Sequence, residues 1–213
     1  MAAARTIRLR REAWGFAIGS LCFLVGAVPM YQRAVGIVVT DLTFFVGALF
    51  FTAAALIQLA LSGRRPPRRG GSRPDRNDWW AAAVQFVGTL FFNVSTTDAL
   101  ILAVNGDAHV GTGWRPDALG SICFLVASGF AVAATVEREG LWDSFARTWR
   151  ATWLNLAGSV LFGLSAIGAY ILPSTGDVVS LLWANLGTFL GAACFLVAAL
   201  LSRRSIPVAA ATA

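Results

Sequence analysis

The chain has 213 residues, of which 57% are hydrophobic and only 13% are charged. A soluble domain carries about a quarter charged residues, so this composition excludes an ordinary soluble protein. The formal net charge of +6 comes from 17 basic residues, all of them arginine, which are grouped in short polar segments between apolar ones. This distribution favours membrane topology over nucleic-acid binding.

Six apolar segments are long enough to cross about 30 Å of hydrocarbon as helices. In chain order they are residues 14–31, 39–61, 79–100, 118–135, 153–172 and 178–201. The sequence therefore predicts an all-α membrane protein with six transmembrane helices.

Each segment contains the same short pattern, in which a glycine is followed by Ser, Ala or Thr and, four residues after the glycine, by phenylalanine. The six glycines are Gly19, Gly47, Gly88, Gly120, Gly158 and Gly191. Small residues at mid-membrane depth let helices approach closely in lipid. We therefore predict that these glycines are helix-packing positions.

Taken in pairs, the patterns recur about every 70 residues, a length that holds two spans and their connections. An Arg-x-x-Trp sequence opens each pair, at Trp14, Trp79 and Trp153, where the indole would lie at the headgroup boundary. We expect three repeated helical hairpins at residues 1–62, 79–135 and 151–202, the second of them divergent.

Three segments lie outside the hairpins. Residues 63–78 are rich in Arg, Pro and Gly and are expected to form a cytoplasmic linker without regular structure. Residues 136–150 carry aromatic side chains at helical spacing, which predicts an amphipathic interfacial helix, with docking of a partner as the alternative. Residues 203–213 are expected to form a disordered cytoplasmic tail.

Arginine is distributed unequally between the two predicted sides of the membrane. One side holds only Arg33 and Arg115. The other side holds Arg5, Arg8, Arg10, Arg11, Arg64, Arg65, Arg68, Arg69, Arg73, Arg76, Arg138, Arg147, Arg150, Arg203 and Arg204. The positive-inside rule then predicts a multi-pass protein of a bacterial inner membrane with both termini cytoplasmic. Anionic lipid is the expected partner of the arginine-rich face, and nucleic acid is not.

The first apolar segment has a second interpretation, because Arg10-Arg11 before an apolar run could belong to a secretory or twin-arginine signal. No small-x-small cleavage site follows the run, and the run contains the first glycine pattern. A retained first span is therefore favoured.

The glycine patterns resemble the YrhK-like family of small bacterial membrane proteins. The sequence from Gly19 to Phe23 and that from Gly47 to Phe51 give the closest unit. The resemblance implies a membrane helical hairpin and brings no established activity, so it lends no catalytic residues.

Polar side chains near the outer ends of the spans are the candidates for function: Asp41, Asn93, Asp98 and Asn185. Acids within spans often face a bundle interior and serve ion or proton pathways. Helix capping and interhelical hydrogen bonds are the structural alternatives. Gln85 and Asn155, each three residues before a pattern glycine, are expected to hydrogen-bond between helices, with a polar substrate site as the alternative.

No catalytic, cofactor or metal motif stands out. The chain has no lysine, which excludes a retinal or pyridoxal Schiff base and a Walker lysine. The three cysteines each follow a pattern glycine by three residues, which indicates packing. We therefore expect no enzyme and no cofactor, but a structural or interaction module for lipid or protein. A transporter or channel for a small solute or cation is the alternative, and a membrane-protein partner or a homo-oligomer stays open.

Overall fold

The computed structural model describes residues 2–63, 65, 72–106, 114–140, 147–172 and 174–204. Within these residues the chain is helical apart from turns and an isolated antiparallel bridge between Ile171 and Val178. The helices are α1 (Ala2–Gly26), α2 (Pro29–Val35), α3 (Ile37–Ser62), α4 (Arg73–Asn105), α5 (Trp114–Glu139), α6 (Arg147–Gly168) and α7 (Leu181–Arg204). The predicted all-α membrane fold is confirmed.

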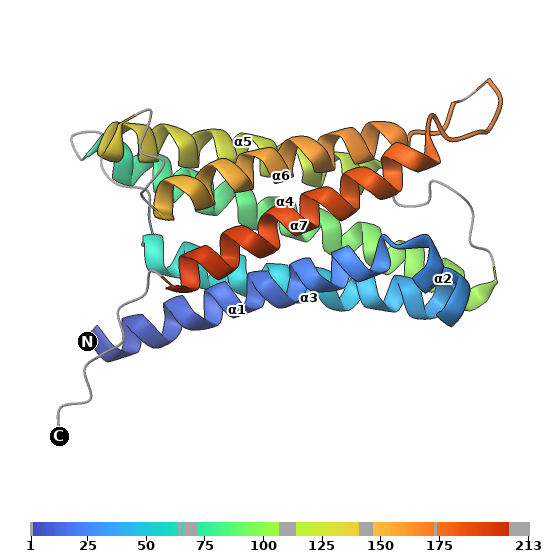
Figure 1. The fold of residues 1–213 in the computed structure, drawn as a ribbon, viewed down its shortest axis with the longest axis horizontal. Helices are drawn as coiled ribbons and strands as arrows, with labels where there is room; N and C mark the ends of the chain where they lie inside the picture. The colour runs from blue at the N-terminus through green and yellow to red at the C-terminus, as the bar shows by residue number, and fades with distance from the viewer. Residues whose placement is uncertain are drawn as a thin grey trace.

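The long helices form one bundle, and the start of α1 and the end of α7 lie at the same end of it (Figure 1). Helix α1 packs on α3, α4 on α5 and α6 on α7, which gives three antiparallel hairpins. Contacts of α3 with α4, α5 with α6 and α7 with α1 close these hairpins into a ring of six helices. Five of the helices are long and apolar enough to span a membrane, and α1 with α2 would make a sixth.

Helix α1 does not continue through the whole first predicted span, residues 14–31. It ends at Gly26, and α2 begins at Pro29 with its axis turned by 80°. Proline has no backbone N–H to donate to the preceding turn, which stops a continuous helix at this point. The chain therefore leaves the bundle direction five residues before the predicted end of the span.

The linker predicted at residues 63–78 is helical in its second half, because α4 already begins at Arg73. The Ser72 side chain caps this helix by accepting a hydrogen bond from Asp75 N at 3.4 Å. Arg138 at the end of α5 pairs with Asp75 at 2.8 Å and also with Asp78. These pairs are exposed, so they contribute little to stability. Residues 64 and 66–71 lie outside the described part of the chain.

The other predicted boundaries differ by a few residues. Within the expected interfacial segment 136–150, α5 continues to Glu139 and α6 starts at Arg147, while residues 141–146 are not described. Helix α6 stops at Gly168 because the chain turns back, with Leu172 N donating to Asp177 O at 2.9 Å. The tail predicted at residues 203–213 begins later, because α7 continues to Arg204. Residues 205–213 and the loop with the sole histidine are outside the described residues.

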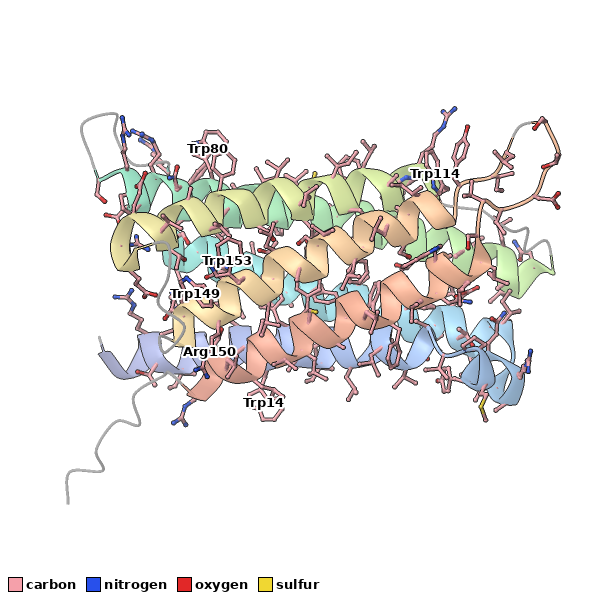
Figure 2. All side chains as sticks on the ribbon, turned by 45° about the horizontal axis from the view of Figure 1, so that its top comes forward. Trp14, Trp80, Trp114, Trp149, Arg150 and Trp153 are labelled. Carbon is pink, nitrogen blue, oxygen red and sulfur yellow. The ribbon has the colours of Figure 1, made fainter. Side chains whose placement is uncertain are left out.

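Tryptophan side chains lie toward the two ends of the bundle (Figure 2). Trp80, Trp149 and Trp153 are near the end where α4 and α6 begin, and Trp114 is near the opposite end. Trp14 and Trp80 are 47% and 43% exposed. Amphipathic indoles at two levels of a bundle are typical of membrane interfaces.

The six pattern glycines meet in pairs, one pair in each hairpin. A Cβ added to Gly19 would lie 2.9 Å from the carbonyl oxygen of Gly47, and the reverse distance is 3.1 Å. The corresponding distances are 3.2 Å in both directions for Gly88 with Gly120, and 3.0 Å for Gly158 with Gly191. Backbone therefore contacts backbone at one point in every hairpin, where any side chain would separate the helices.

The residues around each glycine complete this contact. Ser20, Ala48, Thr89, Ser121, Ser159 and Ala192 follow the glycines and are at most 2% exposed. The Cβ atoms of Cys22, Cys123 and Cys194 pack against the glycine of the facing helix. The phenylalanines that follow form the hydrophobic core of the bundle: Phe23, Phe51, Phe92, Phe124, Phe162 and Phe195.

We predict that Gly191→Ala destabilises the protein, because the new Cβ would lie 2.6 Å from the Phe162 ring and 3.0 Å from Gly158 O. Overpacking of this kind costs about 1–3 kcal/mol. Thermal unfolding in detergent measures the effect. The matched control is Gly163→Ala, because a Cβ at Gly163 meets nothing within 4 Å. Alanine favours helix over glycine by about 1 kcal/mol, so this control should unfold no earlier than the native protein. Equal unfolding temperatures for the two variants would contradict the packing role.

Candidate functional site

The six core phenylalanines form two triangles of rings on the axis of the bundle. In one triangle, Phe51, Phe124 and Phe195 have ring centroids 5.7–6.4 Å apart.

In the other triangle, Phe23, Phe92 and Phe162 are separated by 5.9–6.1 Å. Within each hairpin the two rings are 5.2–5.5 Å apart. Aromatic rings at these distances are in contact, so the triangles close the axis at its middle.

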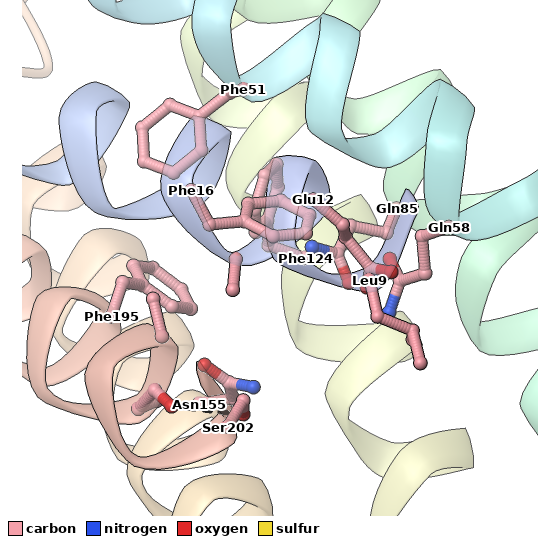
Figure 3. Close-up of a pocket in the computed structure, with 13 residues that line it drawn as sticks. Leu9, Glu12, Phe16, Phe51, Gln58, Gln85, Phe124, Asn155, Phe195 and Ser202 are labelled. Atoms are coloured by element: carbon pink, nitrogen blue, oxygen red, sulfur yellow. Dashed lines mark hydrogen bonds between the residues drawn. The ribbon is translucent and has the colours of Figure 1, made fainter. Parts of the chain in front are cut away.

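A cavity of about 130 Å³ lies on the arginine-rich side of this six-phenylalanine plug, and we call it the inner cavity (Figure 3). The rings of Phe51, Phe124 and Phe195 form its floor. Its polar wall consists of Glu12 from α1, Gln58 from α3, Gln85 from α4, Asn155 from α6 and Ser202 from α7. Five of the six helices in the ring thus contribute a polar side chain to the inner cavity, and the one from α1 is a carboxyl group.

The polar groups of the inner cavity are not fully satisfied by protein. The buried Gln58 Oε1 has no hydrogen-bond partner. Gln85 and Asn155 occupy equivalent positions, and both face the cavity (Figure 3). No hydrogen bond joins the Gln85 and Asn155 side chains in the described structure. The interhelical hydrogen bond predicted for them is therefore not formed. A polar cavity of this size has room for several water molecules, which would supply the missing partners.

A second cavity, of about 220 Å³, lies on the opposite side of the plug, and we call it the outer cavity. Asp41 from α3, Asp117 from α5 and Asn185 from α7 line it, together with the core rings Phe23 and Phe162. The hydroxyl groups of Ser95, Thr96, Ser165 and Thr188 complete its wall. Ser165 and Thr188 hydrogen-bond to each other at 2.7 Å, which fixes the α6–α7 side.

The positions three residues before the pattern glycines explain how the two cavities arise. On the first helix of each hairpin these positions are Phe16, Gln85 and Asn155, and all three line the inner cavity. On the second helices they are Phe44, Asp117 and Thr188, and all three line the outer cavity. Paired helices run in opposite directions, so the same sequence position lies below the plug on one helix and above it on the other.

The ionisable side chains that line these two cavities are all acids. Glu12 is the ionisable side chain of the inner cavity, and Asp41 and Asp117 are those of the outer cavity. No arginine belongs to either of these two linings. Carboxyl groups aimed at a polar cavity would attract cations and repel anions.

The structure brings together two of the four predicted polar residues. Asp41 and Asn185 face the same outer cavity. Asn93 lies instead at the α3–α4 contact, where its Nδ2 donates to Thr52 Oγ1 at 2.8 Å.

Asp98 is exposed and is not part of the cavity wall. The reason is the helical period: Asp98 lies about 240° around α4 from the core residue Phe92, whereas Ser95, Thr96 and Ala99 lie on the side that lines the outer cavity.

Sequence reasoning did not select Asp117 and Glu12 as members of a site. Asp117 stands near the start of the fourth apolar segment, where an aspartate usually caps a helix, and Glu12 lies among basic residues next to the first span. The signal that would have found Asp117 was its place three residues before Gly120, equivalent to that of Thr188 before Gly191.

The chemistry available at these cavities is polar contact, hydration and proton exchange. The described residues contain no group of three or more His, Cys, Asp or Glu side chains that could hold a metal ion. The three cysteines are free and separated on different hairpins. The arrangement is therefore that of two polar cavities separated by a hydrophobic plug.

Comparisons with protein-family models, with curated proteins and with solved structures find no match to this chain.

We predict that the two cavities are reached from opposite sides of the membrane. In a variant whose cysteines are replaced by alanine, which keeps their packing Cβ atoms, single cysteines are introduced at Asn155 and Asp117. A small membrane-impermeant thiol reagent should modify Asn155→Cys from one side only and Asp117→Cys from the other side only. Ala192→Cys is the control, because Ala192 is fully buried and should stay unmodified. Modification of both cavity cysteines from the same side would contradict this arrangement.

Proposed function

We propose that the protein is a multi-pass membrane transport protein that provides a gated path for cations, with the phenylalanine plug as its gate. The observation that carries this proposal is the coincidence of three features on one axis. Two polar cavities contain the carboxyl groups, and six phenylalanines separate them.

The cost of the polar groups supports a role beyond packing. Ionisable and amide groups inside a membrane protein are expensive and usually belong to ion or substrate pathways. Here Glu12, Asp41 and Asp117 all face cavities in the bundle interior. A protein that needed only stable helix packing would gain nothing from placing three carboxyl groups there.

The plug has the properties of a hydrophobic gate. A constriction lined only by apolar rings excludes water and ions until it widens. The contacts between neighbouring hairpins include side-chain hydrogen bonds, several of them between α5 and α6, such as Ser128 Oγ with Ser159 Oγ at 2.8 Å and Thr135 Oγ1 with Thr152 Oγ1 at 3.1 Å. The glycine contacts within hairpins are backbone to backbone. We infer that the hairpins move as units and that the gate opens between them.

The second candidate is the structural or interaction module that the sequence favoured. The observation in its favour is that the rings are in contact and the axis is closed. In that case the plug is simply the core of the bundle, and the cavities hold water only.

We also infer the membrane and the orientation from the arginine distribution. The protein would lie in a bacterial inner membrane with the inner cavity facing the cytoplasm, as the positive-inside rule requires. The resemblance to YrhK-like proteins fits a hairpin repeat and adds no activity.

The orientation gives a direct prediction. A fluorescent protein that folds only in the cytoplasm, fused after Arg204, should be bright, whereas a periplasmic reporter at this site should be inactive. In the matched fusion, at Thr175 in the turn between α6 and α7, the fluorescent protein should be dark and the periplasmic reporter should be active. A dark C-terminal fusion with an active periplasmic reporter would contradict the orientation.

Flux through reconstituted vesicles tests the transport proposal. Replacing Phe162 and Phe195 by alanine removes one ring from each triangle of the plug, so cation flux should rise about tenfold or more above that of the native protein. Adding Asp117→Asn, which keeps the side-chain shape and removes the charge, should reduce this flux.

Asp98→Asn is the matched control, since Asp98 is exposed and outside both cavities. It should leave the flux of the plug variant unchanged. A plug variant that folds but gives no protein-dependent cation flux would contradict the transport proposal. The structural or interaction module would then be the remaining candidate function.

A further inference from the structure

An open groove of about 920 Å³ lies on the side of the bundle, between the α1–α2 bend and the beginning of α7. Most of its lining is apolar, with Ile37 and Phe189 among the larger side chains. Leu181 and Leu182 at its edge are 61% and 70% exposed. These are large apolar surfaces that only lipid or another apolar molecule would cover.

The groove exists because α1 ends early. After Gly26 the chain turns by 80° into α2, so α1 does not continue along the neighbouring first turns of α7. The small residues Ala27 and Val28 form the groove wall at the bend. The groove is therefore a fixed consequence of the helix break at Pro29.

The polar groups of the groove lining are Gln32 and Arg33 on α2 and Asn185 on α7, and the charged one is on the α2 side. Arg33 and Gln32 belong to the lining, and Arg33 is an exposed guanidinium. The lining contains no carboxyl group that could neutralise it. A guanidinium binds the two oxygens of a phosphate in a bidentate manner. One end of the groove thus favours an anion while the rest favours hydrocarbon.

We propose that this groove binds one anionic phospholipid. The headgroup phosphate is bound by Arg33, and an acyl chain lies along Ile37, Leu186 and Phe189. Charge complementarity favours this occupant, because an anionic lipid keeps a net negative charge for the Arg33 guanidinium, whereas the cation of a zwitterionic headgroup offsets its own phosphate and repels Arg33. The site is independent of the proposed transport, although Asn185 belongs both to this groove and to the outer cavity.

The test compares thermal unfolding of the full chain in detergent with added phosphatidylglycerol or with phosphatidylcholine of the same acyl chains. Phosphatidylglycerol should raise the Tm of the native protein by roughly 2–4 °C more than phosphatidylcholine does. Arg33→Gln should remove most of this difference. Arg115→Gln is the matched control, because Arg115 lies at the same end of the bundle but outside the groove, and it should keep the difference.

Two further arms separate the lipid from other occupants. Leu186→Trp would fill the acyl part of the groove and should also remove the difference, with an unchanged Tm in phosphatidylcholine. Glycerol phosphate without acyl chains should have no effect. The proposal is overturned by an equal lipid preference in native protein and Arg33→Gln, or by stabilisation with glycerol phosphate alone. Light scattering that shows a dimer dissociated by Leu186→Trp would also overturn it, since a second copy would then occupy the groove.

Discussion

The backbone contact between paired glycines is the constraint on which the rest of this structure depends. In lipid the hydrophobic effect does not drive helices together, so close van der Waals contact must do so. Gly19 with Gly47, and the equivalent pairs in the other hairpins, bring two helices to the distance at which only hydrogen atoms separate their backbones. The phenylalanine one turn beyond each glycine then reaches the axis. A side chain at any of these glycines would move one helix and withdraw one ring from the core.

The same geometry sorts polar side chains to two sides of the plug. Because the paired helices are antiparallel, one sequence position gives a residue of the inner cavity on the first helix and one of the outer cavity on the second. The first hairpin places Phe16 and Phe44 at these positions, whereas the other two place amide, carboxyl or hydroxyl groups there. The polar surface of the axis therefore comes mainly from the second and third hairpins. The carboxyl groups of the first hairpin, Glu12 and Asp41, lie farther from the plug along their helices.

Much of the fold could be predicted from the sequence, because its signals are local. Apolar segments of sufficient length give the spans, and the regular glycine pattern gives the packing positions. The bend after Gly26 and the start of α4 at Arg73 were missed for local reasons as well. The predicted span 14–31 runs through Pro29, which in the structure starts a new helix. Ser72, which caps α4, lies in a segment rich in Arg and Gly that predicts no regular structure.

The candidate site was less predictable, because it depends on which face of each helix turns to the axis. Asp41 and Asn185 were selected together, and both line the outer cavity. Asp98 was selected for its place in a polar run, yet its helix presents it to the outside. Asp117 was missed since an aspartate near a helix start usually serves as a cap. Helix rotation is set by contacts between hairpins, which no single segment of the sequence reveals.

The central claim is that rings from different hairpins meet on the axis, and a double-mutant cycle between Phe23 and Phe162 tests it most directly. These residues belong to α1 and α6, which α7 separates in the ring of helices, and their ring centroids are 6.0 Å apart. Free energies of unfolding in detergent for Phe23→Ala, Phe162→Ala and the double variant should give a coupling of about 0.5–1.5 kcal/mol. The control pair is Phe23 with Val160, which lies in α6 like Phe162 but is 45% exposed, and the coupling free energy of this pair should be zero. Additive effects for Phe23 and Phe162 would contradict the account, because the two rings would then not share a core.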